Sequence, residues 1–350
     1  MRMGLAADKT VLVTGAAGFI GAFACRRLLA ETGARVVGFD NMNDYYDVSL
    51  KEERLRMLED ASSESSGGFV FVRGDLADVP AVDELFYAHH PDIVVNLAAQ
   101  AGVRYSLDNP RAYIDSNVSG FLNILEACRA SMTGEHPVEH LVYASSSSVY
   151  GDTCEPPYSE EQRTDEPVSL YAATKKADEL MAHAYAHLYG VPATGLRFFT
   201  VYGPMGRPDM AYFKFAEKMR AGNPIQVYNN GDMLRDFTYI DDVVTGVAAV
   251  LGHVPAPDER GVRHKVYNIG NSAPVRLLDF IDTLERVLLE EGAILGPVAR
   301  ELLPMQPGDV YQTCADTSAL QRDFGFAPGT PLEDGLRAFA RWYGGYRGQA

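Results

Sequence analysis

Tyr171 and Lys175 are four residues apart, and a tyrosine and a lysine at this spacing can transfer protons. On a helix, side chains at positions i and i+4 share one face and lie one turn apart. A free phenol has a pKa of about 10, and a neighbouring ammonium group lowers that pKa because it favours the phenolate. We interpret the pair as a candidate acid and base for a substrate hydroxyl. For the pair alone, an ordinary solvated helix face remains the alternative.

The sequence around this pair predicts a helix that follows a loop. Ser169 is a candidate N-cap, after the break at Pro167. Leu170 to Tyr189 then contains no glycine or proline and is rich in residues that favour helices. The polar segment from Asp152 to Ser169 is expected to be a surface loop.

Four consecutive serines, Ser145 to Ser148, follow the apolar segment His140 to Ala144, which is expected to be a strand. In open α/β sheets, ligands bind beyond the carboxyl ends of the strands. A serine run is often ordinary turn chemistry, but at this place in the chain we favour a substrate site.

A glycine-rich turn stands near the start of the chain. Val11 to Thr14 is typical of a buried parallel strand, and Ile20 to Glu31 is expected to be a helix. Between them, Gly15, Gly18 and Gly21 follow G-x-x-G-x-x-G spacing rather than G-x-G-x-x-G. Strand, glycine turn and helix are the context in which backbone N–H groups approach a pyrophosphate.

An acidic residue supports a dinucleotide site. A second expected strand, Arg35 to Phe39, ends at Asp40, nineteen residues after Gly21. This is close to the offset of about 20 for the carboxylate that binds the adenosine ribose. Such a carboxylate accepts hydrogen bonds from the ribose hydroxyls and repels a 2′-phosphate, so we predict a dinucleotide and favour NAD over NADP.

Strands and helices continue to alternate, and we predict an α/β fold with a Rossmann-type doubly wound parallel sheet. Asp75 follows the expected strand Phe69 to Val72, where its carboxylate can reach an adenine. The other elements expected here are loops at Asp44 to Lys51 and Asp60 to Gly68, strands at Ile93 to Gln100 and Ala193 to Phe199, and a helix at Pro110 to Ala130.

The C-terminal part has shorter elements and denser Pro and Gly, which predicts a smaller α/β substrate domain that lids the sheet. We assign 1–200 to an NAD-binding domain, with a later return of the chain near 236–270, and 201–350 to a substrate-binding domain. The elements expected there are a helix at Tyr212 to Ala221, a hairpin-like turn at Ile225 to Asp232, a strand at Arg235 to Ile240, a helix capped by Asp241, a strand at Val266 to Ile269, and helices at Leu277 to Glu290 and Pro331 to Tyr343.

Three residues of this part suit an anionic nucleotide ligand. Arg207 and Arg235 stand beside loop residues, and arginine binds phosphate or carboxylate through two parallel hydrogen bonds. A surface ion pair remains the alternative for each. Asp309, in the tight turn Gln306 to Asp309, either accepts ribose hydroxyls or stabilises the turn.

Composition argues against several classes of function. The 350 residues carry 31 basic and 47 acidic side chains, and the net charge of −16 argues against sequence-independent binding of nucleic acid. Cys25, Cys128, Cys154 and Cys314 lack metal-ligand spacing, so we expect no metal site and a reducing compartment. No apolar run reaches the roughly 18 residues that span a bilayer, and no secretory signal is recognised. We therefore expect a cytoplasmic protein without membrane contact.

With these residues in hand, the chain resembles the extended short-chain dehydrogenase/reductase family over nearly its full length. The motifs that carry the resemblance are T-G-A-A-G-F-I-G at Thr14 to Gly21, N-L-A-A-Q at Asn96 to Gln100, S-S-S-S-V-Y-G at Ser145 to Gly151, Y-A-A-T-K at Tyr171 to Lys175 and R-D-F-T-Y-I-D-D at Arg235 to Asp242. Within that family the chain is most similar to the UDP-glucuronate 4-epimerases, through D-N-M-N-D-Y-Y-D at Asp40 to Asp47, A-A-Q-A-G-V-R-Y-S at Ala98 to Ser106, R-F-F-T-V-Y-G-P at Arg197 to Pro204 and G-R-P-D-M-A at Gly206 to Ala211.

The resemblance implies a role for each matched residue. Tyr171 is the implied acid and base, Lys175 holds the nicotinamide ribose, and Ser146 orients or passes the proton of the sugar 4-hydroxyl. Arg235 is expected to contact the diphosphate, and Asp309 the uridine ribose. The implied NAD contacts are Gly15, Gly18, Phe19, Ile20, Gly21, Asp40, Asn41, Asn43, Asp75, Leu76, Leu97, Ala98, Ala99, Gln100, Asn117, Tyr171, Lys175 and Phe199. The implied UDP-sugar contacts are Arg104, Ser146, Ser147, Ser148, Thr200, Arg207, Val227, Tyr228, Arg235 and Asp309.

The resemblance favours a sugar acid as substrate. Ser147, Ser148 and Thr200 are the implied carboxylate contacts, and UDP-galactose 4-epimerases generally carry Asn at the place of Thr200. The chain departs from the family pattern at Ala22-Phe23, where Ser-His is usual, and at Met205, where Trp is common. The second departure concerns the shape of the sugar pocket.

The implied reaction is NAD-dependent inversion at carbon 4 of UDP-glucuronate, through a 4-keto sugar, to UDP-galacturonate. A UDP-hexose 4-epimerase on neutral sugars and a non-catalytic NAD-sensing protein are the alternatives, although sensors of this fold tend to lose the Tyr171 and Lys175 pair. A dehydratase would need an acidic pair where the serines stand. The resemblance also implies a homodimer, in which Pro110 to Ala130 and Leu170 to Tyr189 pair as a four-helix bundle.

Overall fold

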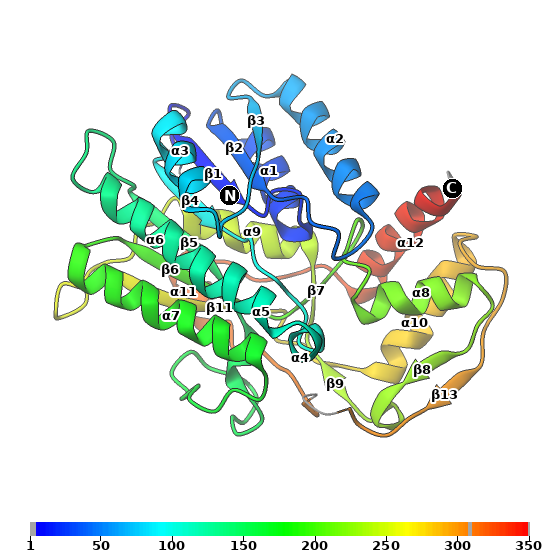
Figure 1. Ribbon diagram of the computed structural model, residues 1–350. Helices are drawn as coiled ribbons and strands as arrows, with labels where there is room; N and C mark the ends of the chain where they lie inside the picture. The colour runs from blue at the N-terminus through cyan, green and yellow to red at the C-terminus, as the bar shows by residue number, and fades with distance from the viewer. Residues whose placement is uncertain (1–4, 307–309, 349–350) are drawn as a thin grey trace.

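The computed structural model describes residues 5–306 and 310–348. Seven parallel strands form one sheet in the order β11-β6-β5-β4-β1-β2-β3 (Figure 1). The strand order reverses between β1 and β4, and ligands of such sheets bind at that crevice. The Rossmann-type doubly wound sheet is therefore confirmed. The strands are β1 (Thr10–Thr14), β2 (Arg35–Asp40), β3 (Phe69–Arg73), β4 (Ile93–Asn96), β5 (His140–Ser146), β6 (Ala193–Phe198) and β11 (His264–Ile269).

Helices cover both faces of this sheet, because its apolar strands must be buried on both sides. One apolar core lies between the sheet and α1, α2, α9 and α11, and a second lies between the other face and α3, α6 and α7. The bounds are α1 (Phe19–Glu31), α2 (Val48–Glu64), α3 (Val79–His89), α6 (Gly120–Ser131), α7 (Leu170–Tyr189), α9 (Ile240–Leu251) and α11 (Ser318–Phe324).

The C-terminal part has an apolar core of its own, to which α8, α10 and α12 contribute (Figure 1). β11 and α9, which come from the segment 236–270, lie with the N-terminal sheet instead. The division of the chain into domains remains an interpretation. The remaining elements are α4 (Tyr105–Asp108), α5 (Pro110–Tyr113), β7 (Thr200–Tyr202), α8 (Ala211–Arg220), β8 (Ile225–Val227), β9 (Leu234–Arg235), β10 (Phe237–Tyr239), β12 (Val275–Arg276), α10 (Leu277–Glu290), β13 (Arg300–Leu302) and α12 (Leu332–Gly348).

Parts of two segments expected to be loops are helical. Helix α2 begins at Val48 and continues to Glu64, so the loop predictions for 48–51 and 60–64 are wrong. Asp47 caps the helix, because its side chain accepts a hydrogen bond from the Ser49 N–H at 3.0 Å. The helix is mostly polar and buries Lys51 and Arg54, so its sequence lacks the apolar stripe that identifies most helices.

The helix predicted over Pro110 to Ala130 is interrupted. A π-helical turn, Ile114–Ser119, stands between α5 and α6. Such a turn holds one extra residue and frequently occurs at functional sites. Here it contains Asn117, whose side chain accepts from the Gln100 N–H at 2.8 Å and donates to the Gln100 carbonyl at 3.1 Å. The interruption therefore places one buried amide against the backbone that follows β4.

Two further expectations fail in the C-terminal part. The hairpin-like turn at 225–232 is wrong, because β8 pairs in parallel with β13, which is distant in sequence. Asp241 lies in the first turn of α9, but the N-cap is Tyr239. The Asp241 carboxylate instead pairs with Arg26, at 3.2 Å, on α1.

The four cysteines are free thiols, of which Cys25 and Cys128 are buried and Cys154 and Cys314 are partly buried. No helix within residues 5–306 and 310–348 combines the length and apolarity that a membrane span requires.

Candidate active site

Helix α7 presents Tyr171 and Lys175 to one cavity of about 390 Å³. The helix begins after Ser169, whose hydroxyl accepts a hydrogen bond from the Ala172 N–H at 3.1 Å, so the predicted N-cap is confirmed. The rings of Tyr113 and Tyr171 form a T-shaped pair, with centroids 6.1 Å apart. The spacing predicted from sequence therefore brings the phenol and the ammonium to the same cavity.

Lys175 is fixed between the helix and the sheet. Its side chain is buried, and its Nζ donates to the Ala144 carbonyl of β5 at 3.0 Å and to Asp178 Oδ2 at 3.1 Å. Burial raises the pKa of the Asp178 carboxyl to about 6, although the charge of Lys175 acts in the opposite direction. The ammonium thus has one fixed position at the carboxyl end of β5.

The serine run continues from β5 into a short turn. The Ser146 hydroxyl accepts from the Ser148 N–H at 3.1 Å and lies 3.1 Å from the Ser148 hydroxyl. Ser146, Ser147 and Ser148 line the cavity with Tyr171. Because the hydroxyls of Ser146 and Ser148 bond each other, the end of β5 presents them as one cluster.

A buried ion pair ties α7 to the strands behind the serines. Arg197 on β6 donates to the two carboxylate oxygens of Glu179, from Nε at 2.8 Å and from Nη2 at 2.9 Å. The Ser145 hydroxyl donates to the same carboxylate at 2.7 Å. Burial opposes the charge of Glu179, but Arg197 outweighs that cost and holds the pKa of Glu179 below its ordinary value.

The glycine turn after β1 has room for backbone only. An added Cβ at Gly21 would stand 2.1 Å from the Gly15 carbonyl oxygen, and one at Gly15 would stand 2.7 Å from the Ala98 nitrogen. Gly15 also has a φ of +70°, which favours glycine. The first N–H groups of α1, after this turn, have no acceptor within the helix and suit an anion.

Two carboxylates lie at the other end of the dinucleotide site. Asp40 Oδ2 accepts from the Ala17 N–H at 3.2 Å, and Asp40 Oδ1 accepts from the Met42 N–H at 2.8 Å. Asp75 Oδ2 accepts from Asn41 Nδ2 at 2.9 Å. Carboxylates at the ends of neighbouring strands β2 and β3, beside a glycine turn, fit the adenosine end of a dinucleotide.

Arg207 enters the cavity from the loop before α8. Its Nε donates to Asp209 Oδ1 at 3.0 Å, and the Tyr45 hydroxyl donates to Asp209 Oδ2 at 3.3 Å. Burial opposes both charges, but the ion pair outweighs it and lowers the pKa of Asp209. Arg207 is thus held as a cation at the cavity wall, where it suits phosphate or carboxylate.

Most residues predicted for the site line this one cavity, although their individual roles remain predictions. They are Gly15, Gly18, Phe19, Ile20, Gly21, Asp40, Asn41, Asn43, Asp75, Leu76, Leu97, Ala98, Ala99, Gln100, Ser146, Ser147, Ser148, Tyr171, Lys175, Phe199, Thr200 and Arg207.

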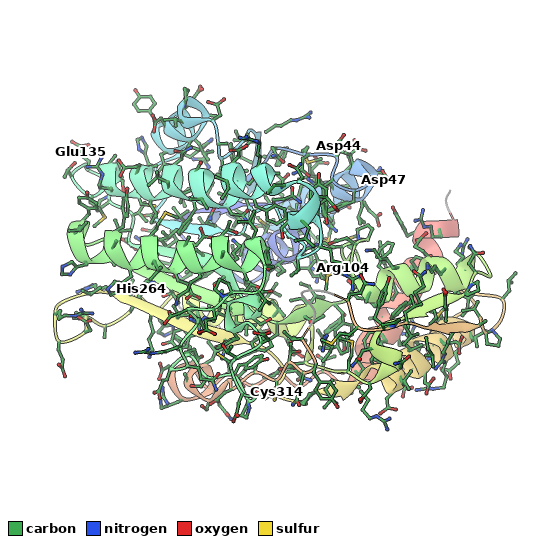
Figure 2. All side chains as sticks on the ribbon, turned by 60° about the horizontal axis from the view of Figure 1, so that its bottom comes forward. Asp44, Asp47, Arg104, Glu135, His264 and Cys314 are labelled. Carbon is green, nitrogen blue, oxygen red and sulfur yellow. The ribbon has the colours of Figure 1, made fainter. Side chains whose placement is uncertain are left out.

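Several predicted substrate residues lie outside the cavity lining. The Arg104 guanidinium stands over the Tyr228 ring at 4.8 Å, and Figure 2 labels Arg104 at the boundary between the N-terminal and C-terminal parts. Val227 is buried at the end of β8. Arg235 donates to the Val310 carbonyl at 2.6 Å. Asp309 falls outside the described residues.

Asn117 also lies outside the cavity lining. Its Nδ2 donates to the Thr174 hydroxyl at 3.0 Å, in addition to its two bonds with Gln100. Gln100 lines the cavity, and Thr174 stands next to Lys175 on α7. The structure therefore places Asn117 behind the site, where it joins α7 to the segment after β4.

The sequence interpretation missed part of the cavity lining, including Tyr45, Tyr46 and Lys51. Lys51 Nζ donates to Asn43 Oδ1 at 3.0 Å and lies 3.5 Å from Asp40 Oδ1. These residues were assigned to a loop. For Tyr45 and Tyr46, the signal that could have found them is the D-N-M-N-D-Y-Y-D string, which begins at Asp40. Lys51 lies beyond the end of that string.

Fold and site together define a class of protein. A parallel sheet with a glycine turn at its switch point, and a Tyr171 and Lys175 pair at the same cavity, are the features of a dinucleotide-dependent enzyme of the Rossmann type. Residues 11–270 match the model of the NAD dependent epimerase/dehydratase family. The chain belongs to this family.

Three relatives show which members of this family the chain is similar to. A probable UDP-glucuronate 4-epimerase of Rhizobium meliloti (strain 1021) is 47% identical over 345 residues, which cover 95% of this chain and 96% of the relative. The crystal structure of UDP-glucuronic acid 4-epimerase from Bacillus cereus, in complex with UDP-glucuronic acid and NAD, matches 96% of this chain and 99% of that chain, with a TM-score of 0.83 and 32% identity. The UDP-glucose 4-epimerase of Thermus thermophilus, in complex with NAD, matches 95% and 98%, with a TM-score of 0.78 and 29% identity.

Proposed function

We propose that this protein inverts carbon 4 of UDP-glucuronate through a 4-keto sugar and forms UDP-galacturonate, with NAD as its cofactor. The observation that carries the proposal is the composition of one cavity, which the glycine turn, the Tyr171 and Lys175 pair, and Ser146 to Ser148 line together. The relatives support the choice of substrate, because the Rhizobium meliloti and Bacillus cereus proteins are both named as epimerases of this sugar acid.

The residues of the cavity fit NAD. The glycine turn after β1, in which Gly21 packs against Gly15, leads into the N-terminus of α1 and suits a pyrophosphate. Asp40 and Asp75 suit the adenosine. Lys175 would hold the nicotinamide ribose. NAD, when bound, supplies the hydride acceptor and donor that oxidation and reduction at carbon 4 require.

Tyr171 moves the proton of the sugar 4-hydroxyl in this proposal. Its phenol oxygen takes that proton when carbon 4 is oxidised and returns a proton when carbon 4 is reduced on the other face, which inverts the carbon. Lys175, one helical turn away, keeps a positive charge near the phenol. The Ser146 hydroxyl, at the end of β5, orients or passes the proton.

A sugar acid also needs groups that hold its carboxylate. Its 4-keto form is a β-keto acid. Such an acid loses CO₂ when the bond between the carboxylate carbon and the ring aligns with the π system of the ketone. Ser147, Ser148 and Thr200 offer three hydroxyls at the cavity wall. Hydrogen bonds from these hydroxyls would hold the carboxylate away from that alignment.

Turnover of separate sugar nucleotides tests the proposal. The purified protein is incubated with UDP-glucuronate, UDP-glucose or UDP-N-acetylglucosamine, and the products are resolved by NMR. We expect UDP-galacturonate from the first and little product from the others. Absence of turnover with all three, and no absorbance of reduced nicotinamide, would support a non-catalytic NAD-sensing protein instead.

The second candidate is a UDP-hexose 4-epimerase that acts on neutral sugars. The similarity to the Thermus thermophilus UDP-glucose 4-epimerase favours it. It needs no carboxylate contacts, so the hydroxyl of Thr200 would have no special role. Turnover of UDP-glucose without turnover of UDP-glucuronate would select this alternative.

We infer further that two copies of the chain pair through α6 and α7. These helices lie side by side (Figures 1 and 2), and Leu122, Leu180 and Leu188 on them are 40%, 61% and 64% exposed. Burial of such side chains against a second copy would stabilise a dimer. Light scattering of the purified protein tests this, and a monomer would overturn it.

We also infer a cytoplasmic location. The four free thiols support it, because reduced cysteines are typical of that compartment. Fractionation of producing cells tests this inference.

A further inference from the structure

Arg54 lies on α2, and its side chain is fully buried. Burial of a charge is costly unless the group is paired and hydrogen-bonded. This guanidinium donates to four oxygens from three separate segments. Those acceptors are neutral, and among residues 5–306 and 310–348 no ion pair joins Arg54 to a carboxylate. The cost of burying the Arg54 charge is thus offset by hydrogen bonds to the three segments that it joins.

The first contact of Arg54 is with the cofactor turn. Its Nη1 donates to the Ala17 carbonyl at 2.9 Å, and the Ala17 N–H donates in turn to Asp40. Nη1 also donates to the Tyr46 hydroxyl at 2.7 Å, and Tyr46 lines the cavity. One end of the guanidinium is therefore anchored to the dinucleotide half of the site.

The second contact is with the loop that carries Arg207. Nε and Nη2 of Arg54 donate to the Met205 carbonyl at 3.0 and 2.7 Å, and Nη2 also lies 3.3 Å from the Gly206 carbonyl. Met205 has a φ of +54°, which is uncommon for a residue other than glycine. A conformation of this kind persists where surrounding contacts hold it, and two N–H groups of Arg54 bind this carbonyl.

We propose that Arg54 is a positioning residue, which fixes the loop from Met205 to Arg207 against the glycine turn and so aims Arg207 at the anionic part of the sugar nucleotide. The proposal rests on the proposed function, because it requires Arg207 to bind the substrate. Arg54 itself does not line the cavity formed by the described residues and acts through the loop.

Arg54→Lys tests this role, because lysine keeps the charge but cannot span four oxygens. We expect the KM for UDP-glucuronate to rise about tenfold, which corresponds to the loss of one or two hydrogen bonds from a charged donor. We expect kcat to fall less than about threefold and the amount of bound NAD per chain to stay unchanged, since the reacting groups are untouched. Loss of bound NAD would overturn the proposal, because Arg54 would then act on the cofactor turn.

A double-mutant cycle with Arg207→Gln separates positioning from general stability. If Arg54 acts through Arg207, then Arg54→Lys should raise KM less than about twofold in the Arg207→Gln background. An equal increase of KM in both backgrounds would overturn the proposal. If Arg207→Gln alone leaves KM unchanged, the substrate role of Arg207 in the proposed function fails, and the role of Arg54 fails with it.

Two further variants keep the test decisive. Arg27→Lys is the matched control, because Arg27 also bonds a backbone carbonyl, that of Asp241, but joins α1 to α9 away from the cavity. We expect it to lower the melting temperature without a change in KM. Should Arg54→Lys fail to fold, Tyr46→Phe removes one acceptor of the same guanidinium. We expect it to raise KM about threefold in the wild type and less than about 1.5-fold in the Arg207→Gln background, and an equal rise in both backgrounds would overturn the proposal.

Discussion

The two halves of the cavity are built differently. The residues proposed to serve the cofactor and the proton transfer are fixed to strands of one sheet: Asp40 ends β2, and Lys175 bonds the Ala144 carbonyl of β5. Residues proposed for the sugar, such as Thr200 and Arg207, come from the short strand β7 and from a loop. The groups proposed for the cofactor and the proton transfer are therefore held by the sheet. Of the groups proposed for the sugar, Ser147 and Ser148 follow β5, but Thr200 and Arg207 lie on segments that can change without altering the sheet.

The strongest test of this comparison is Tyr171→Phe, in the half that is fixed to the sheet. Loss of the proton-transfer group should lower kcat by about 10²–10⁴-fold, because this is the usual contribution of a general acid or base. Bound NAD and the melting temperature should change little. The product is measured by NMR with UDP-glucuronate.

Tyr113→Phe is the control, since the Tyr113 ring faces Tyr171 and its hydroxyl bonds the Ala101 carbonyl at 2.9 Å. We expect a much smaller loss of kcat. Epimerisation at full rate in Tyr171→Phe would contradict the assigned chemistry.

Asp40→Asn should have the next largest effect. The carboxylate accepts from the N–H groups of Ala17 and Met42, and its replacement by a neutral amide should weaken both bonds as well as the proposed contact with the ribose. We expect NAD to bind about 10–100-fold more weakly, from the usual value of a hydrogen bond to a charged group. Cofactor retained after gel filtration measures this. If the variant retains as much NAD as the wild type, then Asp40 stabilises the glycine turn and does not contribute to cofactor binding.

Thr200→Ala tests the half built from loops. If the Thr200 hydroxyl holds the sugar carboxylate, its loss should increase the share of UDP-pentose formed by decarboxylation about fivefold, while kcat changes less than about threefold. The ratio of pentose to galacturonate product is read from NMR spectra. An unchanged ratio would show that Thr200 does not hold the carboxylate. It would also weaken the proposal that segments outside the sheet bind the sugar.

Asp178→Asn should have the smallest effect and probes the helix that carries Tyr171 and Lys175, the pair proposed for proton transfer. Burial raises the pKa of Asp178 to about 6, so the folded protein holds this proton more tightly than the unfolded chain. Stability from this group is therefore present at low pH and lost as the pH rises through about 6. The carboxyl faces Lys175 and Glu179, and asparagine at this position does not titrate.

Between about pH 5.5 and pH 8, the free energy of unfolding should fall about 1 kcal/mol less in this variant than in the wild type. Urea unfolding of both proteins at the two pH values measures the difference. If the free energy of unfolding falls equally in both proteins, the raised pKa of Asp178 is contradicted.

The part of the site that could be predicted from sequence is the part that local rules determine. A cap at Ser169 and a run without glycine or proline gave both ends of α7 correctly, and the four-residue spacing then placed Lys175 one turn after Tyr171. Asp40 was found because the offset from the glycine turn follows from the geometry of one βαβ unit.

The parts that could not be predicted depend on distant contacts. The partner of β8 is β13, more than seventy residues later, and nothing between 225 and 232 indicates it. The π-helical turn around Asn117 depends on the backbone of Gln100, which local propensity does not register. Lys51 and Arg54 resemble surface residues of a polar helix, because burial of a cation depends on acceptors that only the fold supplies.

The buried carboxylate of Glu179 accepts hydrogen bonds from Arg197 and Ser145, and this has a consequence for how the site meets its substrate. Ser145 precedes Ser146, and Glu179 stands one turn beyond Lys175, so the spacing between hydroxyl and ammonium is established when the chain folds. Ligand arrival is not needed to align them. In the proposed mechanism, the 4-keto sugar therefore presents its second face to a hydroxyl and an ammonium that are already in place.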